Sequence, residues 1–159
     1  MSAPMDLAPR LQAGLAPELS QPARTARPGA RALLVEDERV VGDLLAEFLA
    51  IEGYEVDRAM NGREALELTR RRAYALIVSD VRMPDVDGPA LYYELRALNP
   101  EMARRMVFVT GDIMNPETRR FLDETCLPYL EKPFTISEFQ AVIRGVPRSS
   151  DAGLPATGQ

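Results

Sequence analysis

The sequence of 159 residues contains no histidine, a single cysteine and a single lysine. Without histidine, the chain cannot use an imidazole as a general base, as a metal ligand or as a phosphohistidine. A lone cysteine, Cys126, cannot form a disulfide within the chain, which fits the reducing cytoplasm. No apolar run approaches the roughly 18 residues of a membrane span, and no secretory signal pattern opens the chain. We therefore expect a cytoplasmic protein without a membrane partner.

The overall composition is that of a soluble globular domain. Hydrophobic residues make up 46% of the chain and charged residues 27%, and the length suits one domain with a sizeable core. The net charge of −5 argues against nucleic acid as the direct partner.

The lysine content is the sharpest feature of the composition. All but one of the 19 basic residues are arginine, and the exception is Lys132, which directly precedes Pro133. A compact ammonium group acts as a point charge in ways that a planar guanidinium cannot. We therefore expect Lys132 to have a functional role.

Short apolar runs alternate with segments of helical periodicity in the central part of the chain. The runs predict five strands, and the segments with apolar residues every three or four positions predict five helices. The strands are expected at about 32–35, 55–59, 75–79, 106–109 and 129–131, and the helices at about 39–51, 62–71, 89–98, 116–124 and 136–145. This alternation is typical of a parallel sheet covered on both faces, an α/β fold.

The two ends of the chain differ in composition from this central part. Residues 1–30 are rich in alanine and proline and predict a flexible tail or linker, and residues 147–159 predict a disordered tail. Leucines at every fourth position from 7 to 19 leave a short docking helix as the alternative, although Pro9 and Pro17 interrupt it. The folded domain is expected at 31–146.

Polar residues stand where four of the expected strands end. They are Glu36, Asp37 and Glu38 after the first strand, Asp80 at the third, Thr110 at the fourth and Lys132 at the fifth. In a parallel sheet with right-handed crossovers, the carboxyl ends of the strands lie along one edge, where ligands bind. We therefore expect these side chains to converge.

The expected acidic cluster requires a cation. Two carboxylates about 4 Å apart repel each other by roughly 4 kcal/mol at an effective dielectric near 20. Carboxylate oxygens completed by water suit Mg²⁺, and a divalent cation with an ammonium and a hydroxyl suits a phosphoryl group. An aspartate that attacks phosphorus forms an acyl phosphate. The pattern thus indicates Mg²⁺-dependent phosphoryl transfer.

Four segments of the sequence resemble a known family. They are LLVEDE at 33–38, VSDVRMPDVDG at 78–88, FVTGD at 108–112 and YLEKPF at 129–134. In this order and spacing they resemble the receiver domains of two-component response regulators, from about residue 31 to residue 145. The resemblance implies a flavodoxin-like (βα)5 three-layer sandwich with a five-stranded parallel sheet. It also implies a signalling phosphoacceptor that catalyses only its own phosphorylation and dephosphorylation.

The resemblance assigns the phosphoacceptor and the metal ligands. Asp80 would accept the phosphoryl group, and Asp37 and Asp80 would bind Mg²⁺ directly. Glu36, where many family members have aspartate, would act mainly through water in the outer shell of the metal. The backbone carbonyl of Arg82 would be a further ligand.

The resemblance also assigns the residues that hold the phosphoryl group and respond to it. Thr110 would be the switch hydroxyl, and Gly111 would leave the site open. Lys132 would bind the phosphoryl group, and its peptide bond to Pro133 would be cis. Tyr129 would be an aromatic switch whose ring turns inward on activation.

Partners are implied on two sides of the reaction. A sensor histidine kinase or a phosphotransfer protein would donate the phosphoryl group. A downstream protein would bind the face formed by the fourth helix, the fifth strand and the fifth helix. A separate hypothesis pairs Arg82 with Asp112 at the mouth of the site, where they would shield the acyl phosphate from water.

Several alternatives remain open. The chain could be the C-terminal receiver of a hybrid histidine kinase, with residues 1–30 as the linker, although Met1 favours a free-standing protein. Because only a short polar stretch follows residue 145, we expect output through protein contact. A metal-dependent phosphatase of the haloacid dehalogenase type needs a second aspartate where Arg82 stands. A receiver that only binds partners would not need the complete set of site residues.

Overall fold

The computed structural model describes residues 26–147. The predicted tails at 1–30 and 147–159 therefore lie almost entirely outside the described residues. Five strands form one sheet in the order β2-β1-β3-β4-β5, and every pairing is parallel. The strands are β1 (Arg31–Val35), β2 (Glu55–Ala59), β3 (Leu76–Asp80), β4 (Met106–Thr110) and β5 (Tyr129–Glu131). This order is that of flavodoxin-like folds, so the predicted fold class is confirmed.

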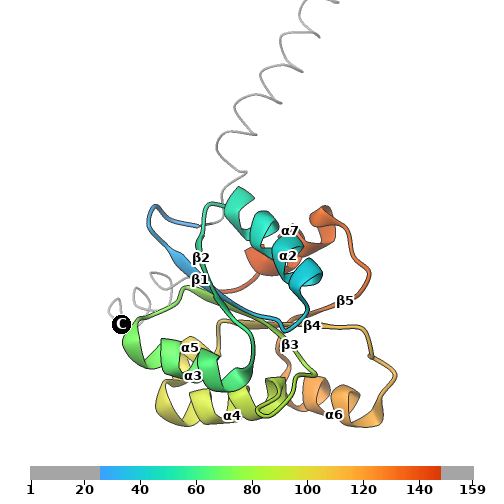
Figure 1. Cartoon of the computed structure of the whole chain (residues 1–159). Helices are drawn as coiled ribbons and strands as arrows, with labels where there is room; N and C mark the ends of the chain where they lie inside the picture. The colour runs from blue at the N-terminus through green and yellow to red at the C-terminus, as the bar shows by residue number, and fades with distance from the viewer. Residues whose placement is uncertain (1–25, 148–159) are drawn as a thin grey trace, which may run out of the picture.

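Helices cover both faces of the sheet (Figure 1). Those of the described part are α2 (Arg39–Ile51), α3 (Gly62–Arg71), α4 (Gly88–Leu98), α5 (Pro100–Ala103), α6 (Pro116–Thr125) and α7 (Ile136–Arg144). One apolar cluster joins the sheet to α2 and α7, and the other joins it to α3, α4, α5 and α6. Successive residues of β1 belong to different clusters, Leu33 to one and Leu34 to the other, because successive side chains of a strand point to opposite faces. The three layers follow from this alternation.

Local capping contacts fix where several helices begin. The side chain of Asn61 accepts a hydrogen bond from the backbone of Glu64, and Asp87 caps α4 in the same way. Thr135 and Glu138 form the predicted capping box at the start of α7. At the end of α2, Gly53 has a φ of +102°, a left-handed conformation that glycine adopts without steric cost.

Two features of the fold differ from the sequence prediction. The four-residue helix α5 was not predicted; it begins where the side chain of Asn99 accepts a hydrogen bond from the backbone of Met102. Residues 26–30, which the sequence prediction places in the tail, contact the domain instead. The backbone N–H of Ala26 donates to the carbonyl of Glu52 at 3.2 Å, and Ala30 packs against an apolar cluster.

No helix within residues 26–147 has the length and apolar character needed to cross a membrane.

Candidate functional site

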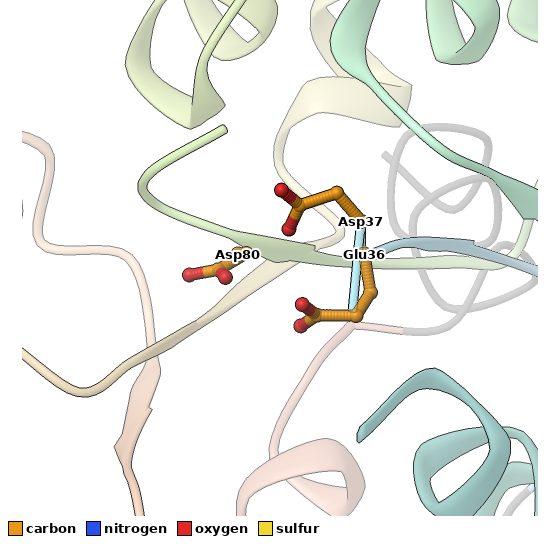
Figure 2. Close-up of side chains that lie close together, drawn as sticks. All are labelled: Glu36, Asp37 and Asp80. Atoms are coloured by element: carbon orange, nitrogen blue, oxygen red, sulfur yellow. The ribbon is translucent and has the colours of Figure 1, made fainter. Parts of the chain in front are cut away.

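Three carboxylates converge at the carboxyl edge of the sheet. Glu36 and Asp37 follow β1, and Asp80 ends the neighbouring strand β3, with Val35 paired to Ser79 in the ladder. One carboxylate oxygen from each of the three acidic residues lies within 4.8 Å of the others. Figure 2 shows the three side chains gathered beside one another. The structure thus brings together the acidic residues that the sequence singled out.

The carboxylate of Glu36 is the most deeply buried of the three. Glu36 is 1% exposed, and its Oε2 accepts a hydrogen bond from the backbone N–H of Glu38 at 3.1 Å. Its Oε1 is buried without a hydrogen-bond partner. Burial, with the nearby Asp80 carboxylate, raises the pKa of Glu36 to about 7. Because a buried carboxylate oxygen without a hydrogen bond, beside two other carboxylates, is costly, this donor set fits a hard cation such as Mg²⁺.

The only lysine of the chain faces the acidic cluster. The ammonium Nζ of Lys132 lies 3.4 Å from Asp80 Oδ2, 3.7 Å from Glu36 Oε1 and 3.9 Å from Glu38 Oε1. Burial raises the pKa of the Asp80 carboxyl group, although the charge of Lys132 opposes this. The peptide bond between Lys132 and Pro133 is cis. The ammonium group of Lys132 and the carboxylate of Asp80 therefore share one largely buried site.

The end of β4 contributes a buried hydroxyl to the same edge. Thr110 is 1% exposed, and its Oγ1 accepts a hydrogen bond from the backbone N–H of Asp112 at 3.0 Å. At the next residue, Gly111, a Cβ would make ordinary contact with the side chain of Lys132, 3.9 Å from its nearest carbon. The hydroxyl is therefore held by its own loop in this structure.

The loop after Asp80 forms the other wall of the site. The backbone N–H of Arg82 points to Asp80 Oδ1 at 3.4 Å. The Arg82 guanidinium lies 3.6 Å from Asp112 Oδ2, and both side chains are about half exposed. The two residues that the sequence placed at the mouth are thus within ion-pair distance.

Tyr129 is the first residue of β5, the strand at one edge of the sheet. It is 37% exposed, and its hydroxyl accepts a long hydrogen bond of 3.4 Å from Arg119 of α6. The ring therefore points outward in this structure.

Two residues of the site had no role in the sequence prediction. Glu38 was noted only as a strand-end acid, yet its carboxylate reaches Lys132. Gly88 is the first residue of α4, and a Cβ there would lie 2.6 Å from the carbonyl oxygen of Asp80. The sequence does show a glycine at the end of the segment 78–88. Only the structure shows why glycine is needed there: the backbone at residue 88 lies too close to the backbone of Asp80 for a side chain.

The model of the response regulator receiver domain family matches residues 32–144. The chain belongs to this family. Receiver domains of this kind are signalling modules of two-component systems, which interact with histidine kinases and downstream effectors. The predicted resemblance is therefore confirmed at the level of family and fold.

The relatives that this chain resembles include both regulators and a sensor kinase. The probable transcriptional regulator ycf29 of Porphyra purpurea is 32% identical over 114 residues, which cover 72% of this chain and 54% of that protein. The sensor kinase CckA of Brucella abortus is 33% identical over 124 residues, covering 77% of this chain and 13% of that protein. This chain thus spans about half of the first relative and far less of the second.

Solved receiver domains have the same fold. The receiver domain of the sensor histidine kinase PA1611 from Pseudomonas aeruginosa has a magnesium ion coordinated in its active site cleft. It superposes with a TM-score of 0.65 and 29% sequence identity, covering 73% of this chain and 95% of that chain.

Proposed function

We propose that this receiver domain accepts a phosphoryl group on Asp80 in a Mg²⁺-dependent reaction and thereby switches a protein-interaction surface. The observation that carries the proposal is the convergence of Glu36, Asp37 and Asp80 opposite the Lys132 ammonium. Among the side chains of the cluster, Asp80 combines partial burial with a direct contact to the ammonium. It is therefore the carboxylate best placed to be the nucleophile.

In this reaction, a carboxylate oxygen of Asp80 forms a bond to phosphorus while the bond between phosphorus and the donor breaks. The donor atom is a histidine nitrogen of a kinase or phosphotransfer protein, or an acetate oxygen of acetyl phosphate. Lys132 can bind the phosphoryl oxygens, because its Nζ already lies 3.4 Å from the attacking carboxylate. The donor leaves with the electron pair of the broken bond.

The residues that would hold Mg²⁺ are Asp37, Asp80 and the backbone carbonyl of Arg82, with Glu36 in the outer shell. When bound, the cation supplies neutralisation of the phosphoryl and carboxylate charges. The buried Oε1 of Glu36, which lacks a hydrogen-bond partner, supports this assignment.

The switch begins at Thr110. Phosphorylation adds about −1.5 to −2 charges to the site. The Thr110 hydroxyl, whose oxygen accepts from Asp112, can donate its own proton to the new oxygens in an arrangement of the loop that brings it to them. That arrangement gains population when the phosphoryl group is present. Movement of Thr110 would leave space for the ring of Tyr129, and Gly111 keeps the site open for both changes.

The proposed output face consists of α6, β5 and α7, which are the fourth helix, the fifth strand and the fifth helix of the sequence prediction. Tyr129 lies on it, and the exposed Met114 adjoins it. The partner would be a downstream protein, with no direct contact to nucleic acid. A cytoplasmic location is part of the proposal and rests on the single cysteine and on the kinase that would donate the phosphoryl group.

Intact mass after incubation with acetyl phosphate and Mg²⁺ tests the proposal. We expect the wild-type protein to gain the mass of one phosphoryl group, and we expect Asp80→Asn to gain none. Omission of Mg²⁺ should abolish the gain in the wild type. An equal gain in Asp80→Asn would refute Asp80 as the acceptor.

A further inference from the structure

Glu38 has an unusual place at the start of α2. It is the residue before the first turn, where a short polar side chain normally accepts a backbone hydrogen bond, yet its side chain makes no such bond. The Glu38 carboxylate instead lies 3.9 Å from Lys132 Nζ, and the same ammonium group also contacts the carboxylates of Asp80 and Glu36. Its side chain is 66% exposed, in contrast to that of Glu36, which is 1% exposed. Glu38 can therefore move without disturbing the core.

The three carboxylates that contact Lys132 belong to Glu36, Glu38 and Asp80, and they differ in how freely they can move when a phosphoryl donor binds. Asp80 is the nucleophile of the proposed function, and Glu36 is fixed by burial and by the backbone of Glu38. Glu38 has no such restraint on its side chain, so its carboxylate is the member of the set that the incoming phosphoryl oxygens can displace. An exposed ion pair of this kind is weak and screened by salt, which suits a contact that must break in each cycle.

We infer that Glu38 is a positioning residue that holds the Lys132 ammonium in the unphosphorylated protein and competes with the phosphoryl donor for it. The inference rests on the proposed function, in which Lys132 binds the phosphoryl group. Removal of the Glu38 charge frees Lys132 before the donor binds. The donor then binds more readily, while the rate at saturation stays the same because the bound donor has already displaced Glu38.

The matched control is Glu131→Gln. Glu131 is an exposed carboxylate directly before Lys132 in the chain, and the described structure gives no ion pair between the two. Glu131→Gln therefore changes the net charge near the site as Glu38→Gln does, without removing a contact to the ammonium.

Since Lys132 is the only lysine in the chain, untagged protein grown with lysine labelled at Cε gives one lysine side-chain signal by NMR. In Mg²⁺-free, unphosphorylated protein, we expect Glu38→Gln to shift this signal and to increase its mobility, and we expect Glu131→Gln to leave it unchanged. In acetyl phosphate titrations at low salt with Mg²⁺, Glu38→Gln should lower the half-saturating concentration about two- to five-fold, with an unchanged maximal rate. High salt should remove this difference.

A lysine signal that Glu38→Gln leaves unchanged would overturn the inference, whatever the phosphorylation result. A changed signal with an unchanged half-saturating concentration, or with an equal effect of Glu131→Gln, would overturn the competition. If the wild type were not phosphorylated at all, the proposed function would fail, while the lysine signal would still decide whether Glu38 holds Lys132.

Discussion

At the residue scale, the site concentrates negative charge that the protein alone does not fully compensate. Lys132 contributes one positive charge to a cluster of three carboxylates that lie within 4.8 Å of one another. Burial and the neighbouring Asp80 carboxylate raise the pKa of Glu36 to about 7, and burial raises the pKa of Asp80 although the charge of Lys132 opposes this. The cost falls on the stability of the protein without a bound cation.

The stability of the metal-free protein should therefore depend on pH through Glu36. The folded protein keeps the Glu36 proton up to a pH of about 7, while the unfolded chain releases it near 4.5. Between these values the folded state binds more protons, so the free energy of unfolding falls as pH rises, by up to about 1.4 kcal/mol per pH unit. Below 4.5 and above 7 this group adds no further slope.

Urea denaturation in the presence of a chelator at pH 5.5 and pH 8 measures this effect. We expect the wild type to be less stable at pH 8 and Glu36→Gln to lose much of the difference. Added Mg²⁺ should restore stability to the wild type at pH 8, because the deprotonated cluster binds the cation. Identical pH slopes in the two proteins would contradict the assigned role of Glu36.

Two residues at the mouth of the site, Arg82 and Asp112, form an exposed ion pair. We propose that the pair, 3.6 Å apart, partly shields the acyl phosphate from water. Arg82→Ala should then shorten the half-life of the phosphoryl group, measured by loss of the added mass after the donor is removed. Asp112→Asn should act in the same direction, and unchanged half-lives in both variants would dispose of the shielding role.

At the scale of the elements, the start of α4 packs closely against the end of β3, where Asp80 lies. The backbone N–H of Gly88 donates to the carbonyl of Val81 at 2.9 Å. A Cβ at Gly88 would lie 2.6 Å from the carbonyl oxygen of Asp80 and 2.9 Å from a ring carbon of Phe108. Since Phe108 is fully buried and the Asp80 carbonyl belongs to the sheet, neither atom can move freely.

Gly88→Ala should lower the free energy of unfolding by roughly 1–3 kcal/mol, the usual cost of overpacking. It should also slow phosphorylation by acetyl phosphate, because Asp80 must shift. Gly145→Ala at the end of α7 is the matched control, since a Cβ there finds its nearest neighbour at 3.5 Å. If thermal denaturation showed both variants equally stable, the tight contact would not constrain the site.

The elements themselves could be predicted from the sequence to a large degree. The bounds of α2, β2 and β5 agree with the prediction. For α2, apolar residues at helical spacing and the glycine that follows it define the bounds well. The helix α5 was missed because four residues show no period, although Asn99 and Pro100 form the same cap signal as Asn115 and Pro116. The convergence of the strand-end residues was predictable, because parallel topology requires it. The contact of Glu38 with Lys132 was not, since it depends on the path of one flexible side chain.

At the scale of the whole molecule, the site lies at the edge of the sheet, where elements of both layers meet. Thr110 ends β4, which is paired with β5, and the hydroxyl of Tyr129 on β5 contacts α6. A movement at Thr110 therefore has a short route to the outer surface. We propose that this route couples phosphorylation to the output face.

The route can be tested with Thr110→Val, which keeps the shape of the side chain and removes its hydroxyl. We expect this variant still to be phosphorylated, because Asp80 and Lys132 are intact. Hydrogen exchange of the backbone at 112–131 should change on phosphorylation of the wild type and not of the variant. The same change in both proteins would show that the hydroxyl is not the trigger.

The central claim is that Asp80 carries an acyl phosphate, and reduction by borohydride tests it most directly. Borohydride converts an aspartyl phosphate to homoserine, which peptide mass spectrometry locates in the chain. After treatment with acetyl phosphate and Mg²⁺, we expect homoserine at position 80 and at no other aspartate. Homoserine at Asp37 or elsewhere, or none in a protein that had gained phosphoryl mass, would contradict the claim.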